Sequence, residues 1–369
     1  MKKMIFTAAM MLASAAAMAQ SGTFQIKGNV EGLPDSLVAM VERKTENIEV
    51  KKKKFVYSKN FDKPQWVYLC DLKVIKSGVF KANRVFAIPG ETIAMKGNFT
   101  EGVDIKGGKF YQEQELMDEY KGQAHKDIKA LRKWYSDNVN DSNRDSIEKV
   151  VDERMEPLQK KYAADLLAYA KQHSGQECIA LLIDELDDVK DKETLISLMA
   201  DNVKNGRMKA YYEPIVERAK KRAEMEEKAK VVQASGVEAP DFTLNDINGK
   251  PFSLSNLRGK YVVIDFWGSW CIWCIKGMPK MKEYYEKYKG KFEILGVDCG
   301  DTEAKWKAAV EKHQLPWIHV YNPKGSDVLG KYAIQGFPTK IVVGPDGKIV
   351  KTIVGEDPAF YTLLDEVLK

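Results

Sequence analysis

The sequence predicts a multi-domain protein with an N-terminal antiparallel β domain, a central α-helical connector and a C-terminal α/β domain. Two observations carry this prediction. The chain has 369 residues, more than one hydrophobic core usually organises, and the spacing of its apolar residues changes near residues 107 and 235. The formal net charge of +5 is spread along the chain without a basic block, so charge indicates no nucleic-acid partner.

The first 19 residues have the pattern of a secretory signal peptide. Lys2 and Lys3 precede an apolar run over residues 4–16, and residues 17–19 supply a small-x-small cleavage pattern. We therefore expect cleavage after Ala19 and a periplasmic or cell-envelope location. The run is short for a bilayer span and no later segment reaches about 20 apolar residues, so no stable membrane insertion is expected.

Residues 20–107 are predicted to form the β-rich N-terminal domain. Short runs with the composition of strands are separated there by Gly, Pro, Asp and Asn. Strands this short, with turn residues between them, are typical of an antiparallel sandwich or barrel. The runs are residues 23–29, 36–43, 66–72, 84–88 and 92–99.

Residues 108–235 are predicted to be helical. Apolar residues recur at helical spacing through 147–167. The segment 218–233 combines strong helix formers with charges of both signs, which is typical of a solvated helix face. Gly236 and Pro240 end this pattern, so the last domain is expected to begin at residue 236.

Residues 236–369 are predicted to form the α/β domain. Apolar runs with strand composition alternate there with stretches of helical character, and this alternation indicates an α/β sheet. The strand runs are residues 261–267, 292–298 and 339–345, and the helical stretches are 275–289, 302–313 and 358–368.

Cys271 and Cys274, separated by Ile272 and Trp273, form the most informative motif. Cys271 follows the apolar strand run 262–267 and a Gly-Ser turn, so it should lie at or near a helix N-terminus. Unpaired backbone N–H groups and the helix dipole stabilise a thiolate there. We therefore predict that Cys271 is the nucleophile and Cys274, one turn later, the resolving thiol. This pair is itself the redox group, and no separate cofactor is expected.

A zinc half-site and a structural disulfide are the alternative interpretations of the motif. A structural zinc site needs four ligands, but the chain has no second CxxC. Five cysteines in an exported chain of this length are also too sparse for a disulfide-stabilised scaffold. The sequence therefore favours redox chemistry and predicts no metal. The four histidines, none at matching ligand spacing, are His125, His173, His313 and His319.

The other three cysteines have less specific surroundings. Cys299 follows the strand run 292–298, where a third redox thiol or a buried inert thiol is consistent with the sequence. Cys70 and Cys178 are expected in the core, and a bridge between them stays open.

The stretch 262–274, "VVIDFWGSWCIWC", with "GFPT" at 336–339, resembles the active-site strand, helix and cis-proline loop of the thioredoxin superfamily. Residues 238–271 are similar to the exported TlpA/ResA-like branch, which overlaps in sequence with the AhpC/TSA peroxiredoxins. The resemblance covers about 237–369. It implies a thioredoxin fold and an enzyme of the thiol-disulfide oxidoreductase class.

The resemblance also implies roles for individual residues. Asp265, six residues before Cys271, matches a buried acid that accepts and returns the proton of the second cysteine, and a carboxyl in an apolar strand should have a raised pKa. Phe337 and Pro338 match the loop that faces the cysteines and pairs with an extended substrate segment. Pro279 matches a helix-kinking proline.

The predicted substrate-binding group is completed by Trp270, which is expected to pack beside the site, and Trp273, which should be exposed between the cysteines.

The TlpA/ResA pattern often has a glutamate three residues after the second cysteine, where this chain has Gly277. Ile272 and Trp273 include neither the usual proline nor a histidine that would stabilise a thiolate. A less stabilised thiolate makes a less oxidising couple, so reduction or isomerisation of protein disulfides is favoured over oxidation. A membrane thiol relay is the expected electron donor.

Two other functions compete with this interpretation. A thiol peroxidase of the AhpC/TSA type needs Pro-x-x-x-Thr/Ser-x-x-Cys, but Ile264 and Gly268 lie seven and three residues before Cys271. Alternatively, the β domain and helices form a non-enzymatic binding module that carries the thioredoxin domain as a passenger. These regions resemble an accompanying segment of unknown function in bacterial envelope thioredoxin-like proteins, and that resemblance assigns no residue.

Overall fold

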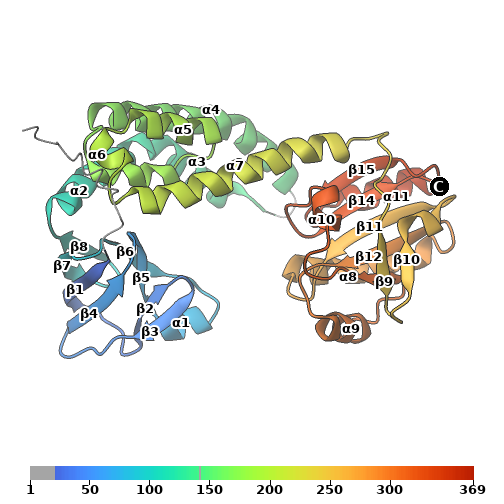
Figure 1. Cartoon of the computed structure of the whole chain (residues 1–369), viewed down its shortest axis with the longest axis horizontal. Helices are drawn as coiled ribbons and strands as arrows, with labels where there is room; N and C mark the ends of the chain where they lie inside the picture. The colour runs from blue at the N-terminus through green and yellow to red at the C-terminus, as the bar shows by residue number, and fades with distance from the viewer. Residues whose placement is uncertain (1–20, 141–142) are drawn as a thin grey trace, which may run out of the picture. The chain divides into compact units, whose positions relative to one another are not determined.

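The computed structural model describes residues 21–140 and 143–369, so the predicted signal peptide lies outside the described residues. The chain divides into two compact units, the first ending at Ala219 and the second beginning at Lys220. The division falls within the helix α7 (Lys209–Val232). Figure 1 shows strands and then helices in the first unit, and a sheet with helices in the second. The predicted fold class is confirmed in this order of elements.

The β part of the first unit consists of two four-stranded sheets, ordered β4-β1-β7-β8 and β3-β2-β5-β6. The predicted antiparallel arrangement holds for every pairing except β1 with β7, which is parallel. The strands of the first sheet are β1 (Gly22–Glu31), β4 (Lys54–Phe61), β7 (Thr92–Asn98) and β8 (Gly102–Lys106). Those of the second are β2 (Leu37–Val41), β3 (Lys44–Asn47), β5 (Gln65–Asp71) and β6 (Ala82–Ala87), and the short helix α1 (Leu72–Lys76) follows β5.

Both sheets bury one face in a shared core. In β1, Phe24, Ile26 and Val30 are buried and alternate with more exposed residues, as expected for a strand with one solvated face. Buried residues of the second sheet belong to the same cluster, which is the arrangement of a β-sandwich. Gly28 of β1 lies opposite Phe55. A Cβ atom at position 28 would lie 1.9 Å from the Phe55 ring, so any larger residue would require this buried ring to move.

The rest of the first unit is helical. The segment η1 is a 3₁₀ helix in which six successive residues, 178–183, are all buried, because α2, α5 and α6 pack around it. Lys192 of α5 donates from Nζ to the carbonyls of Ile183 and Leu186 and so satisfies the end of this buried segment. The helices are α2 (Lys109–Ala124), α3 (Lys126–Asn138), α4 (Arg144–Gln172), η1 (Glu177–Asp184), α5 (Val189–Leu198), α6 (Asp201–Lys204) and α7.

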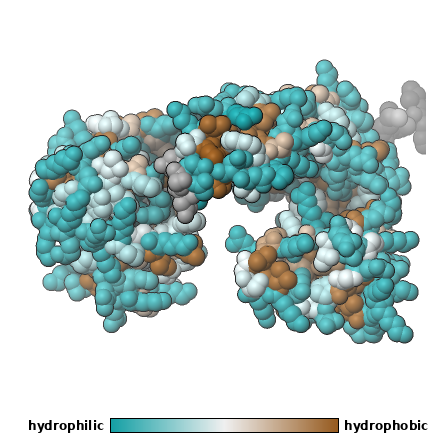
Figure 2. All heavy atoms as spheres, turned by 180° about the vertical axis from the view of Figure 1, so that it is seen from behind, coloured by the Kyte–Doolittle hydropathy of each residue, from teal (hydrophilic) through white to brown (hydrophobic). Residues whose placement is uncertain are grey.

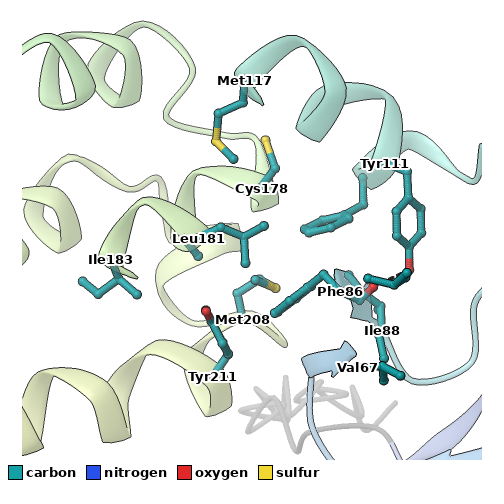
Figure 3. Packing of buried hydrophobic residues seen from close by; sticks show 14 of the residues in the cluster. Val67, Phe86, Ile88, Tyr111, Met117, Cys178, Leu181, Ile183, Met208 and Tyr211 are labelled. Atoms are coloured by element: carbon teal, nitrogen blue, oxygen red, sulfur yellow. Dashed lines mark hydrogen bonds between the residues drawn. The ribbon is translucent and has the colours of Figure 1, made fainter. Parts of the chain in front are cut away.

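Phe86 of β6 joins the β part to the helices. Its ring stacks on Phe110 of α2 with a centroid distance of 5.6 Å and meets Tyr211 of α7 edge-on at 4.8 Å. The Tyr111 hydroxyl donates to the Phe86 carbonyl at 3.0 Å. Figure 3 shows Phe86 with Tyr111 and Tyr211 on either side of it. The strands and helices of the first unit therefore share one core.

We expect Phe86→Ala to destabilise the first unit by about 3–5 kcal/mol, because it removes a fully buried ring from a packed core. Phe80→Ala removes an exposed ring and should change the free energy of unfolding by less than about 0.5 kcal/mol. Amide hydrogen exchange in β5 and β6 measures this free energy within the first unit. Equal effects of the two substitutions would contradict the assignment of Phe86 to the joint core.

The second unit contains a seven-stranded mixed sheet ordered β10-β9-β13-β12-β11-β14-β15. The central strands β11, β12 and β13 are parallel to one another, and the remaining pairings are antiparallel. The strands are β9 (Thr243–Asp246), β10 (Pro251–Ser253), β11 (Tyr261–Trp267), β12 (Phe292–Asp298), β13 (Ile318–Tyr321), β14 (Thr339–Val343) and β15 (Ile349–Val354).

Strand β11 is buried on both faces, which explains its continuous apolar run. Val263 and Trp267 belong to the hydrophobic cluster that also contains residues of α8, α9 and α11. Val262, Ile264 and Phe266 belong to the cluster on the opposite face, with residues of η2 and α10. By this alternation, Asp265 faces the α8 side of the sheet. The helices are η2 (Leu254–Leu257), α8 (Ile272–Lys287), α9 (Glu303–Lys312), α10 (Val328–Lys331) and α11 (Ala359–Val367).

The displayed surface is mainly hydrophilic, with hydrophobic residues in small separate clusters (Figure 2). Among the helices of the described part of the chain, none is both long and apolar enough to cross a membrane.

Candidate active site

Cys271 and Cys274 lie where β11 passes through a short turn into α8. Cys271 is the N-cap of this helix, and its sulfur accepts a hydrogen bond from the Cys274 N–H at 3.2 Å. The two sulfurs are joined in a disulfide. Both residues are buried. The predicted position of Cys271 is therefore the one at which backbone N–H groups and the helix dipole act on its sulfur. Pro279 lies further along the same helix.

The loop after β12 holds the turn that precedes the cysteines. The Asp301 carboxylate accepts hydrogen bonds from the Ser269 N–H at 2.6 Å and from the Ser269 hydroxyl at 2.7 Å. The Trp270 indole N–H donates to the carbonyl of Cys299 at 2.8 Å. Sequence reasoning did not identify Ser269 or Asp301, because their pairing depends on how β11 and β12 are aligned. These bonds fix the chain immediately before Cys271.

Hydrophobic side chains are exposed around the buried disulfide. Trp270, Ile272 and Trp273 have 56%, 63% and 57% of their surface exposed. Trp270 meets Phe337 edge-on with a centroid distance of 5.3 Å, so two of the predicted substrate-binding residues lie together. Trp273 lies on the first turn of α8 with the Lys276 ammonium 4.4 Å from its ring. An exposed apolar rim of this kind is typical of a binding surface.

The Phe337–Pro338 peptide bond is cis, as the motif predicted. Pro338 is buried and Phe337 is half-buried. The Pro338 carbonyl accepts a hydrogen bond from the Gly355 N–H at 2.8 Å, so this carbonyl is engaged within the domain. In this loop, Phe337 is therefore the residue that contributes to the rim through its contact with Trp270.

Asp265 is a buried carboxyl on the α8 side of β11, with 5% of its surface exposed. Its Oδ1 atom has no hydrogen-bond partner. Burial raises the pKa of Asp265 to about 6; the nearby Lys340 opposes this rise and Glu356 adds to it. Lys340 is the cross-strand partner of Asp265 in the β11–β14 pairing, so both side chains face the same side of the sheet.

The buried Lys340 and the partly exposed Glu356 form an ion pair that sequence reasoning missed. Lys340 is 1% exposed, and its Nζ atom lies 2.9 Å from Glu356 Oε2. The Tyr361 hydroxyl donates to Glu356 Oε1 at 2.7 Å. One signal for Lys340 was present in the sequence: a lysine stands inside the apolar run 339–343, and a buried lysine requires a partner. Nothing local pointed to Glu356.

The other three cysteines are free and buried. Cys70 and Cys178 do not form the bridge that the sequence left open. Burial raises the pKa of the Cys299 thiol, and the neighbouring Asp298 and Asp265 raise it further, so Cys299 is protonated and enclosed at neutral pH. Among the residues that the structure describes, no group of three or more His, Cys, Asp or Glu side chains could hold a metal ion.

The position three residues before Cys271 is closed to any side chain. A Cβ atom on Gly268 would lie 2.5 Å from the indole nitrogen of Trp270 and 2.8 Å from the carbonyl oxygen of Cys299. Together with Ile264 at the other required position, this geometry disfavours the peroxidase arrangement considered above.

Comparison with known proteins relates the C-terminal part of the chain to thiol-disulfide oxidoreductases. The AhpC/TSA family matches residues 235–352. The thiol-disulfide oxidoreductase ResA of Bacillus cereus (strain ZK / E33L) is 42% identical over 122 residues, which are 33% of this chain and 70% of that protein. ResA of Bacillus subtilis (strain 168) is 34% identical over 123 residues, or 33% and 68% of the two chains. The thioredoxin domain of a Bacteroides vulgatus thiol-disulfide oxidoreductase is 37% identical and covers 37% of this chain and 99% of its own, with a TM-score of 0.35.

The mixed sheet, the cis-proline loop and the cysteine pair at a helix N-terminus define a thioredoxin-like domain. Through this C-terminal third, the chain belongs to the ResA-related thiol-disulfide oxidoreductases of the AhpC/TSA family, and it carries an additional N-terminal region. The resemblance inferred from the motifs is thereby confirmed, as is the enzyme class.

The raised pKa of Asp265 makes stability depend on pH. Between about pH 4 and pH 6 the unfolded chain loses the Asp265 proton and the folded chain keeps it, so stability falls as the pH rises. Asp265→Asn removes this loss. The free energy of unfolding of the variant, compared with that of the unchanged protein, should therefore rise by up to about 3 kcal/mol as the pH goes from 4 to 7. This figure follows from a shift of about two pKa units.

Urea unfolding of the oxidised variant and the oxidised unchanged protein at several pH values measures this difference in the free energy of unfolding. Burial also raises the pKa of Asp298, to about 8, but Asp298 is present in both proteins and its contribution cancels in the difference. A difference that stays constant from pH 4 to pH 7 would contradict the burial argument for Asp265.

Proposed function

We propose that this protein is an exported thiol-disulfide oxidoreductase that reduces or isomerises disulfide bonds in proteins. The observation that carries the proposal is the buried Cys271–Cys274 pair at the N-terminus of α8, with Asp265 on the facing strand and exposed aromatic side chains around it. The reduced cysteine pair supplies the electrons, Asp265 accepts the proton of Cys274, and the exposed aromatic side chains contact the substrate.

The reaction begins with the reduced cysteine pair. The Cys271 thiolate attacks one sulfur of the substrate disulfide, a mixed disulfide forms, and the other substrate sulfur leaves as a thiolate. Cys274 then transfers its proton to the Asp265 carboxylate, and its thiolate attacks the sulfur of Cys271. The mixed disulfide breaks, the second substrate sulfur leaves, and the Cys271–Cys274 disulfide forms. Two electrons have passed from the enzyme to the substrate.

The helix N-terminus supports the order of these steps. A sulfur at the N-cap of α8 receives the Cys274 N–H and the positive end of the helix dipole, so negative charge on Cys271 is stabilised. This stabilisation makes Cys271 the thiolate that attacks first, and in the second step the substrate sulfur is the leaving group. Cys274, within the first turn of α8, is the thiol that must lose a proton for the second attack.

The surroundings of the pair support a protein substrate. Trp270, Ile272 and Trp273 are more than half exposed, and Phe337 extends the same apolar surface through its contact with Trp270. A chain segment with apolar side chains beside its cysteine can cover this surface, whereas a small thiol leaves it exposed.

The dipeptide between the cysteines supports the reducing direction. Neither Ile272 nor Trp273 adds a positive charge beside Cys271, so the thiolate is less stabilised than in strongly oxidising relatives. A reductase that is exported, as the pattern of residues 1–19 predicts, must be re-reduced after each turnover. A membrane thiol relay is the donor class that fits this need.

Replacement of Cys274 by Ser should stop the reaction at the mixed disulfide. We expect Cys274→Ser to accumulate substrate proteins bound through Cys271, visible on non-reducing gels and released by dithiothreitol, and to lose insulin reduction. The Cys299→Ser control removes a buried thiol outside the pair and should retain turnover. Unchanged insulin reduction by Cys274→Ser, with no trapped protein, would refute the proposed mechanism.

Equilibration of the full chain with glutathione buffers tests the direction. We expect a potential nearer to that of a reducing thioredoxin, about −270 mV, than to that of a strongly oxidising periplasmic enzyme, about −120 mV. Alkylation of the two thiols followed by mass spectrometry measures the reduced fraction. A potential at the oxidising end would instead assign the protein to disulfide formation.

A further inference from the structure

A second carboxylate lies against α8 on the side that carries Cys274, although it comes from a distant part of the chain. Gly277 is three residues after Cys274, so the two positions share a side of the helix. A Cβ atom on Gly277 would lie 2.2 Å from Glu356 Oε2 and 2.7 Å from Oε1. Glu356 follows β15, and its carboxylate occupies the space that a side chain at position 277 would need.

This carboxylate is held in place from two sides. Lys340 Nζ contacts Oε2 at 2.9 Å, and the Tyr361 hydroxyl donates to Oε1 at 2.7 Å. Tyr361 also lies 3.4 Å from the Gly277 carbonyl, which ties α11 to the same turn of α8. A buried lysine is costly to desolvate unless it is paired; Lys340 is paired with Glu356, and both oxygens of Glu356 have a partner. The position of the charge is therefore defined by the fold.

One lysine faces two carboxyl groups at this point. Lys340 is the cross-strand partner of Asp265, yet its hydrogen bond goes to Glu356, and Asp265 Oδ1 has no partner. With Asp265 protonated, the three side chains Asp265, Lys340 and Glu356 carry no net charge. Without the Glu356 charge, the lysine would be left to stabilise the Asp265 carboxylate alone.

We propose that Glu356 is a positioning residue for proton transfer at Asp265: by pairing with Lys340 it keeps the lysine charge from holding Asp265 in its ionised form. Asp265 then keeps enough proton affinity to accept the Cys274 proton and to return it. The inference rests on the proposed function, since it concerns the same resolving step.

Other ionisable groups near Asp265 do not replace this role. Burial raises the pKa of Tyr361 and of Cys299, so neither carries charge near neutral pH. The ionisable groups coupled to Asp265 by charge are Lys340 on β14, Glu356 after β15, Tyr361 on α11 and Cys299 after β12. Helix α8, which carries Cys274, packs on the side of the sheet that Asp265 faces.

Glu356→Gln in the full chain tests the inference, because it removes the charge and keeps an oxygen that can accept from Tyr361. We expect the pKa of Asp265 to fall by about one unit, measured by ¹³C NMR of its carboxyl, and the single-turnover rate of insulin reduction to fall several-fold, because the base is weaker. Glu366→Gln is the matched control: it removes an exposed carboxylate on α11 and should leave both quantities unchanged.

Two further variants separate the charge from the packing. Gly277→Ala keeps the Glu356 charge but pushes its carboxylate away from Lys340, and should shift the Asp265 titration in the same direction. In an Asp265→Asn background, Glu356→Gln should have no additional effect on the pH profile, because its action passes through Asp265. If Glu356→Gln does not fold, Gly277→Ala carries the same test.

The outcomes distinguish this inference from the proposed function. If the pKa of Asp265 in Glu356→Gln or Gly277→Ala equals that in the unchanged protein, and the variant still reduces insulin, the role of Glu356 is overturned and the proposed function is left intact. Failure of the unchanged protein to reduce insulin, with no protein trapped by Cys274→Ser, would instead overturn the proposed function itself.

Discussion

Burial of β11 on both faces is the constraint on which the C-terminal unit depends. The side chains of this strand alternate between two hydrophobic clusters, so residues 262–267 are all enclosed. The strand fixes the start of the following turn, and the loop at 299–301 holds that turn through Ser269 and Trp270. The cysteine pair is thereby presented by packed elements and not by a mobile loop, which is what a site of defined geometry requires.

The same enclosure determines the electrostatics of the site. A carboxyl buried on this strand is largely removed from bulk water, so its proton affinity depends strongly on the few charges that the fold brings to that side of the sheet. Lys340 and Glu356 are such charges, and both are removed from bulk solvent to a large degree. Salt screens buried charges much less than surface charges. The pKa of Asp265 should therefore depend on these neighbouring charges and respond only weakly to the salt concentration.

Local patterns predicted the three regions in order, eight of the fifteen strands of the described residues and the cysteine pair, because periodicity and a short motif are properties of neighbouring residues. Strand β4 was not predicted: its short apolar run 55–57 stands among lysines and other polar residues that resemble a loop. The parallel pairing of β1 with β7 has no local signal, since about 60 residues separate the strands. For the same reason the sequence did not predict that Lys340 and Glu356 lie beside Gly277, because this contact depends on strand register and helix packing.

The crowded environment of Gly268 has an evolutionary consequence. A hydroxyl-bearing residue cannot enter this position by one substitution, because its first side-chain carbon would overlap the Trp270 indole and the Cys299 carbonyl. Replacing Trp270 would relieve only the first overlap, and the second requires the backbone after β12 to move. In this chain, a change from disulfide exchange toward peroxide chemistry at this position therefore requires two segments to move together, the Trp270 side chain and the backbone after β12.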